Sequence, residues 1–191
     1  MKKIAFIFPG QGSQYAGMGK DFYDTYSCAK EMIDLASEVS GMDMNHLLFE
    51  ENEELNITKY TQIAMLADEL AILQVLKEKG YTASVTAGLS LGEYAALVAS
   101  GVMTPEDAFR VVVKRGAYMQ EAVPEGGAMT AIMGMDNETI EKICEETDGI
   151  VSVANYNCPG QTVITGEAPA VEAAAAALKA AVEPIAIKEA V

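Results

Sequence analysis

The chain has 191 residues, half of them hydrophobic, which is enough for one large domain or for a core with a smaller domain inserted. Its formal net charge is −15 and no basic stripe is present, which argues against nucleic acid as a partner. No apolar run reaches the roughly 18 residues that a membrane span needs, so we expect no membrane partner either.

The first part of the chain alternates strands and helices. In chain order, the apolar spacing and the glycine and proline stops predict a strand at 4–8, helices at 29–39 and 61–79, a strand at 83–87, and helices at 91–99 and 104–121. This alternation implies a mainly parallel sheet and an α/β fold class.

The segment Pro124-Glu125-Gly126-Gly127 is the clearest boundary in the chain. It predicts two parts, residues 1–125 and residues 126–191. In the second part we predict strands at 128–133, 150–154, 162–165 and 184–188, with helices at 137–146 and 168–181. The resulting β-α-β-β-α-β order is that of a ferredoxin-like unit.

Three cysteines, Cys28, Cys144 and Cys158, are far apart and form no CxxC pair. This pattern favours a reducing, cytoplasmic location and argues against a disulfide scaffold or a zinc site. The sequence contains a single histidine, His46, so we expect no histidine-ligated metal site. We interpret His46 as a helix-end or partly buried residue rather than a catalytic base.

A nucleophile motif lies where a predicted strand meets a predicted helix, at Gly88-Leu89-Ser90-Leu91-Gly92. The G-x-S-x-G pattern in that context is typical of a strained strand-to-helix turn that exposes a reactive serine. The start of the helix then stabilises negative charge that develops beside Ser90. The alternative is an ordinary turn flanked by glycines.

A second glycine-rich loop, Pro9-Gly10-Gln11-Gly12-Ser13-Gln14, follows the first strand. It lacks the final glycine of G-x-G-x-x-G and the Gly-Lys-Ser/Thr of a phosphate loop. A serine nucleophile needs two backbone N–H donors for its oxyanion, and we assign them to Gln11 and Leu91. The alternative is a plain turn between a strand and a helix.

Arg115 lies in the middle of a predicted helix, with apolar residues one turn away on either side. A cation placed there needs a partner. That partner is either one of the many acidic side chains, in a structural salt bridge, or the carboxylate of a substrate, held by a bidentate pair. We assign Met119, Met129 and Met133 to the core, and we leave the segment 155–161 open between a hairpin turn and a functional loop.

Taken together, these motifs resemble the malonyl-CoA:acyl-carrier-protein transacylases of fatty-acid synthesis and the acyltransferase domains of polyketide synthases. The resemblance runs through the whole chain in order. The matching residues are Phe8-Pro9-Gly10-Gln11-Gly12-Ser13-Gln14, Thr61-Gln62, Ala87-Gly88-Leu89-Ser90-Leu91-Gly92-Glu93-Tyr94, Arg115-Gly116, Met119-Gln120, Asn155, Asn157, Pro159 and Gln161.

The resemblance implies an α/β-hydrolase-like large subdomain with an inserted ferredoxin-like small subdomain. It implies Ser90 as the acyl-accepting nucleophile, Gln11 and Leu91 as the oxyanion-hole residues, and Arg115 as the clamp for the malonyl carboxylate. The expected reaction moves a malonyl group from coenzyme A to acyl carrier protein, with malonyl-CoA and acyl carrier protein as partners. No cofactor is expected, because the coenzyme A and phosphopantetheine thioesters are substrates.

The sequence departs from the family pattern in three places. Leu89 stands where the family usually has histidine, and Ile63 where it usually has proline. The family's catalytic histidine follows the last strand of the small subdomain, and this sequence stops at Val191 before reaching it. We therefore expect the large subdomain to be incomplete. A serine enzyme that lacks its general base loses most of its turnover, so we also expect these 191 residues to be inactive or nearly so.

Two other functions remain open from the sequence. A serine hydrolase or thioesterase would use the same turn, although a hydrolase of neutral esters has no reason to place Arg115 there. A non-catalytic fragment would instead bind the missing C-terminal segment or an acyl carrier protein.

Overall fold

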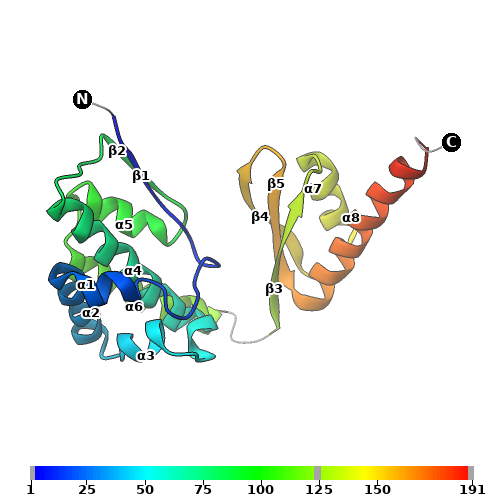
Figure 1. Cartoon of the computed structure of the whole chain (residues 1–191). Helices are drawn as coiled ribbons and strands as arrows, with labels where there is room; N and C mark the ends of the chain where they lie inside the picture. The colour runs from blue at the N-terminus through cyan, green and yellow to red at the C-terminus, as the bar shows by residue number, and fades with distance from the viewer. Residues whose placement is uncertain (1–2, 123–125, 189–191) are drawn as a thin grey trace. The chain divides into compact units, whose positions relative to one another are not determined.

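The computed structural model describes residues 3–122 and 126–188, with the backbone alone from 182 onward. The chain forms two compact units that divide between Ala122 and Val123 (Figure 1). The predicted boundary segment begins at Pro124, and residues 123–125 lie outside the described residues. The α/β class predicted from the sequence is confirmed, because both units combine helices with a sheet.

The first unit packs a group of helices against a small sheet. Its elements are β1 (Ala5–Phe8), α1 (Lys20–Thr25), α2 (Ser27–Ser40), α3 (Met44–Phe49), the 3-10 helix η1 (Glu54–Asn56), α4 (Thr58–Glu78), β2 (Val85–Gly88), α5 (Gly92–Ala99) and α6 (Pro105–Ala122). The predicted elements of this part are confirmed with small shifts at their ends. The elements α1, α3 and η1 were not predicted, because each is too short to carry a periodic pattern.

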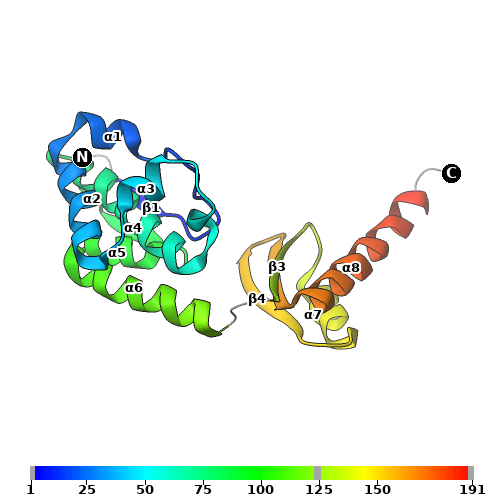
Figure 2. The ribbon, with the colours of Figure 1, turned by 90° about the horizontal axis from the view of Figure 1, so that it is seen from below.

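Helix α4 forms the centre of the first unit. It contacts α2, α5 and α6 (Figures 1 and 2). Its buried residues lie on all sides of the helix. A helix that is apolar all round is expected to be enclosed by other elements. The buried set on α4 also contains three polar residues, Thr61, Gln62 and Glu69.

Strands β1 and β2 pair in parallel, with Ala5 opposite Val85 and Phe8 opposite Gly88. Phe6 and Phe8 point to the helices and join their core. The other face is open in the described residues, where Ile7 is 77% exposed. Parallel strands that are neighbours end at the same edge, so the loops after β1 and β2 emerge side by side.

The second unit is a three-stranded antiparallel sheet with helices on one face. Its elements are β3 (Gly127–Met133), α7 (Asn137–Glu146), β4 (Val151–Cys158), β5 (Gln161–Glu167) and α8 (Ala168–Lys188), and the strand order is β3-β5-β4. Its core is small and consists of Ile140, Cys144, Ile164, Val171, Ala174 and Leu178. Residues 155–158 belong to β4, so the connection to β5 is a tight turn at Pro159 and Gly160.

The predicted strand at 184–188 is wrong, because these residues continue α8 to Lys188. Alanine has the highest helix propensity, which favours the helix as far as Pro184, and α8 continues past this proline to Lys188. A strand at 184–188 would also need a neighbour in the sheet, and β3 is paired with β5 alone among the described strands.

The assignment of three methionines to the core is also wrong. Met129 is 63% exposed and Met133 is 66% exposed, and Met119 on α6 is exposed as well. Side chains alternate along β3, and Ala128 and Ile132 occupy the face that packs on the helices. Met129 and Met133 therefore lie on the opposite face of the sheet.

Candidate functional site

Ser90 sits between β2 and α5 in a strained backbone conformation. Its φ is 52°, and it is the one residue other than glycine with a positive φ among the described residues. Such a conformation costs a non-glycine residue free energy and is found at functional sites more often than elsewhere. The strand-to-helix context predicted for Ser90 is therefore present.

The two glycines that flank Ser90 are required by close backbone approach. A Cβ on Gly88 would lie 2.1 Å from the Gly92 carbonyl oxygen, and a Cβ on Gly92 would lie 2.4 Å from the Phe8 carbonyl oxygen. Any larger residue would push the start of α5 away from the ends of both strands. The G-x-S-x-G pattern is thus a packing requirement at this turn.

The loop after β1 lies against the Ser90 turn. The Leu89 N–H donates to the Phe8 carbonyl at 3.1 Å, and a Cβ on Gly10 would lie 2.9 Å from the Leu89 carbonyl oxygen. Gln11 is the next residue of this loop. On the other side of Ser90, Leu91 is fully buried and is the N-cap residue of α5.

Arg115 reaches Ser90 from α6. Its Nη2 donates a hydrogen bond to Ser90 Oγ at 2.9 Å, and its Nη1 donates to Gln62 Oε1. Its Cζ lies 5.7 Å from the centre of the Tyr94 ring. None of the ion pairs formed among the described residues includes Arg115. The structural salt bridge considered for this cation is therefore absent from that part of the chain.

Gln62 is a site residue for which the sequence analysis predicted no role. It is 1% exposed, its Nε2 donates to Gln11 Oε1 at 2.7 Å, and its Oε1 accepts from Arg115. The Gln11 side chain is also held by Thr58 Oγ1, to which its Nε2 donates at 3.3 Å. Gln62 thus joins the loop after β1 to the arginine. The available signal was the Thr61-Gln62 pair among the residues that carry the family resemblance.

Gly116 allows α6 to come close enough for these bonds. A Cβ on Gly116 would lie 3.1 Å from Lys59 Cα and 3.3 Å from Gln62 Cβ. Both contacts are tighter than ordinary packing allows, so an alanine would force the two helices apart. Arg115 and Gly116 are adjacent in the motif that carries the family resemblance. The close contact between α4 and α6 explains why a glycine follows the arginine.

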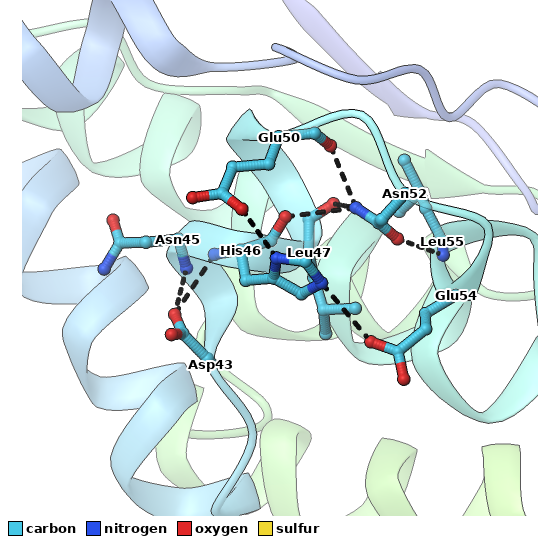
Figure 3. A network of polar contacts seen from close by, with 8 residues as sticks. All are labelled: Asp43, Asn45, His46, Leu47, Glu50, Asn52, Glu54 and Leu55. Carbon is cyan, nitrogen blue, oxygen red and sulfur yellow. Dashed lines mark hydrogen bonds and ion pairs between the residues drawn. The ribbon is translucent and has the colours of Figure 1, made fainter.

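His46 belongs to a different network, on α3 and the segment that follows it (Figure 3). Its Nδ1 lies 2.8 Å from Glu50 Oε2, and its Nε2 lies 3.5 Å from Glu54 Oε2. The hydrogen bond with Glu50 raises the pKa of the imidazole above its usual value. His46 is half-buried and lies in the last turn of α3, which agrees with its interpretation as a helix-end or partly buried residue.

Within residues 3–122 and 126–188, no helix has the length and apolar character needed to cross a membrane. In the same residues, His, Cys, Asp and Glu side chains nowhere gather in a group of three or more that could hold a metal ion.

Comparison with known proteins gives the family. Residues 5–190 match the family described as the acyl transferase domain. The chain is 49% identical over 179 residues to the malonyl CoA-acyl carrier protein transacylase of Bacillus subtilis (strain 168), covering 91% of this chain and 56% of that protein. The protein of the same name from Escherichia coli (strain K12) is 49% identical over 186 residues, which cover 95% of this chain and 60% of the relative.

Solved structures agree with these relatives. A crystal structure of MCAT from Streptococcus pneumoniae is 52% identical with a TM-score of 0.83, and the match covers 93% of this chain and 59% of that one. A malonyl-transacylase in complex with a type II PKS acyl-carrier protein is 48% identical with a TM-score of 0.88, covering 95% of this chain and 60% of its own. The chain belongs to the acyl transferase domain family. It spans less than two thirds of the length of these relatives.

Proposed function

We propose that this chain is part of an acyltransferase that moves a malonyl group from coenzyme A to acyl carrier protein through a seryl-acyl intermediate. The observation that carries the proposal is the pairing of Ser90 with a cation that lacks a carboxylate partner among the described residues. Two names support it: the curated relatives are malonyl CoA-acyl carrier protein transacylases, and one solved relative is in complex with an acyl-carrier protein.

In this proposal Ser90 Oγ attacks the thioester carbonyl and forms a tetrahedral intermediate, while the general base takes the hydroxyl proton. The carbonyl oxygen becomes an oxyanion, and the Gln11 and Leu91 N–H groups are the proposed donors to it. The intermediate then collapses to the seryl ester, and coenzyme A leaves as the thiol with the proton that the base returns to its sulfur. The phosphopantetheine thiol of the carrier protein then attacks the seryl ester, and the malonyl group leaves Ser90 as a new thioester.

Arg115 has the role of selecting the acyl group. Its guanidinium has more N–H donors than the bonds to Ser90 and Gln62 use, so it retains capacity for a bidentate pair with a carboxylate. A malonyl group has such a carboxylate at the end remote from the thioester, and an acetyl group has none. A hydrolase of neutral esters gains nothing from this arrangement, so no observation favours the hydrolase.

The general base is the part of the mechanism for which these residues supply no candidate. His46 is the one histidine of the sequence, and its ring nitrogens are engaged by Glu50 and Glu54. The family resemblance implies that the base is a histidine that follows the small subdomain.

We also propose that the first unit corresponds to the α/β-hydrolase-like large subdomain and the second to the ferredoxin-like small subdomain.

Mass spectrometry of the chain after incubation with malonyl-CoA, together with the C-terminal segment that the longer relatives have, tests the proposal. We expect a malonyl adduct on the peptide that contains Ser90, and its absence in Ser90→Ala. An adduct on Ser13 or Ser84 with Ser90 unmodified would overturn the assignment of the nucleophile. If all three serines stay unmodified while that segment is present, transfer through a seryl intermediate is contradicted.

A further inference from the structure

Arg115 is held in place without a counter-charge from the described residues. The hydroxyl of Ser90 and the amide of Gln62 accept its hydrogen bonds, and both acceptors are neutral. The third neighbour, the Tyr94 ring, is neutral as well. In a chain with 28 acidic side chains, a half-buried cation surrounded by neutral groups requires an explanation.

Tyr94 is well placed to hold the guanidinium. It lies in the first turn of α5, and its N–H donates to the carbonyl of Leu91 at 3.1 Å. Its side chain is half-buried and packs against the core of the first unit, which fixes the orientation of the ring. The backbone of Tyr94 is therefore held in a fixed position relative to the turn that carries Ser90.

The face of an aromatic ring attracts a cation electrostatically but does not neutralise it. A carboxylate at the same place would form an ion pair with Arg115, and that pair would compete with any carboxylate carried by a ligand. The other cation of α6 illustrates the alternative: Arg110 Nη2 lies 2.5 Å from Glu106 Oε1 and is paired within its own helix.

We propose that Tyr94 is a positioning residue for Arg115, whose ring directs the guanidinium to Ser90 while leaving its charge free for an acyl group that carries a terminal carboxylate. The identity of the ligand rests on the proposed function. The contact between Tyr94 and Arg115 does not.

Side-chain NMR of the two arginines, Arg110 and Arg115, tests the contact directly. The ring current of Tyr94 shifts the Arg115 side-chain resonance, which Arg115→Lys identifies by its loss. We expect Tyr94→Leu to move the Arg115 resonance and leave that of Arg110 in place, and Tyr94→Phe to leave both in place. Retention of the Arg110 resonance and of the amide spectrum shows that the variants fold. An Arg115 resonance that is the same in Tyr94→Leu overturns the proposal.

Binding of malonyl-CoA and acetyl-CoA, measured in a Ser90→Ala background to prevent turnover, tests the consequence. We expect Tyr94→Leu to reduce the preference for malonyl-CoA by about 2–5-fold, the range of a cation–π contact at a partly exposed site, and Tyr94→Phe to retain the preference. A shifted Arg115 resonance with an unchanged preference overturns the positioning role. If the chain with Tyr94 unchanged binds the two thioesters equally, the proposed function and the proposed ligand are overturned. The shift of the Arg115 resonance then still tests whether Tyr94 contacts Arg115.

Discussion

Gly92 and Phe8 approach so closely that a Cβ on Gly92 would lie 2.4 Å from the Phe8 carbonyl oxygen. The contact joins the start of α5 to the end of β1 and sets where the Ser90 turn lies. Because the clash is with backbone on both sides, no change of rotamer relieves it.

Gly92→Ala should therefore lower the free energy of unfolding by about 3 kcal/mol, at the upper end of the cost of overpacking. Gly41 is the matched control, because its φ is 71° and nothing lies within 4 Å of the position of its Cβ. Its alanine variant suffers backbone strain alone, roughly 1–2 kcal/mol. Urea denaturation measures both, and equal losses would show that the approach of Gly92 to Phe8 does not matter for stability.

With the C-terminal segment of the longer relatives present, Arg115→Ala should reduce acylation of Ser90 by malonyl-CoA far more than acylation by acetyl-CoA. A charge-assisted pair contributes roughly 1.5–3 kcal/mol, which corresponds to about 10–150-fold in the ratio of the two rates. The control is Arg110→Ala, which removes an exposed arginine of the same helix that is paired with Glu106. Equal losses for the two thioesters would contradict selection of a carboxylate by Arg115.

Gln62→Glu replaces a buried amide by a carboxylate of nearly the same shape. The new charge lies beside Arg115 Nη1 and should pair with it, so that the guanidinium is no longer available to a substrate carboxylate. We expect the ratio of malonyl to acetyl acylation to fall about as far as in Arg115→Ala. Gln74→Glu, on the same helix but away from these contacts, is the control. A ratio that Gln62→Glu leaves unchanged would exclude a role for Gln62 in holding the arginine.

The sequence was sufficient to locate the turn at Ser90 and the cation at Arg115. The turn has a local cause, since Gly88 and Gly92 are adjacent to the residue that they allow to be strained. Arg115 was identified because a charge on an apolar helix face is unusual. Both signals are contained in a few consecutive residues, and the structure adds the distance between them.

Other features depend on packing between distant segments. Gln62 interacts with Gln11, 51 residues away, and with Arg115, 53 residues away, so no local pattern could indicate its bonds. The exposed positions of Met129 and Met133 follow from which face of β3 the helices cover. The strand predicted at 184–188 failed for a related reason: a strand needs a partner, whereas a helix forms its own bonds.

His46 should titrate above the usual range for histidine, because the Glu50 carboxylate favours its charged form. The sequence has a single histidine, so its ring signal in an NMR titration is unambiguous. The stabilisation is fully present below the pKa of the unfolded chain, about 6.5, and is lost as the pH rises through the pKa of the folded state. His46→Gln should therefore be less stable than the original chain under acidic conditions and approach it as the pH rises.

Glu50→Gln should return the pKa of His46 towards its usual value. Glu51→Gln is the control, because Glu51 is a neighbouring acid that is not bonded to His46. If His46 titrates at the same pH in all three proteins, the carboxylate contact does not set its charge.

Among the described residues, Glu69 gives the strongest expected dependence of stability on pH. It is 7% exposed on α4, and neither of its carboxyl oxygens has a hydrogen-bond partner among the described residues. Burial, with the nearby charge of Asp68, raises its pKa to about 8. Burial likewise raises the pKa of Asp68 to about 6, with a contribution from Asp21. Both carboxyls therefore hold their protons in the folded state at a pH where the unfolded chain has lost them.

The sign follows from this difference in bound protons. Stability falls as the pH rises through the interval in which the unfolded chain is ionised and the folded chain is not, from about 4.5 to about 8 for Glu69. Glu69→Gln is neutral in both states. Its free energy of unfolding should match that of the original chain near pH 4 and exceed it by an amount of the order of a few kcal/mol at pH 8. Asp68→Asn should give a smaller gain that is complete near pH 6. Urea denaturation across this range measures the three curves. A constant difference between Glu69→Gln and the original chain at every pH would mean that the pKa of Glu69 is the same in the folded and the unfolded chain.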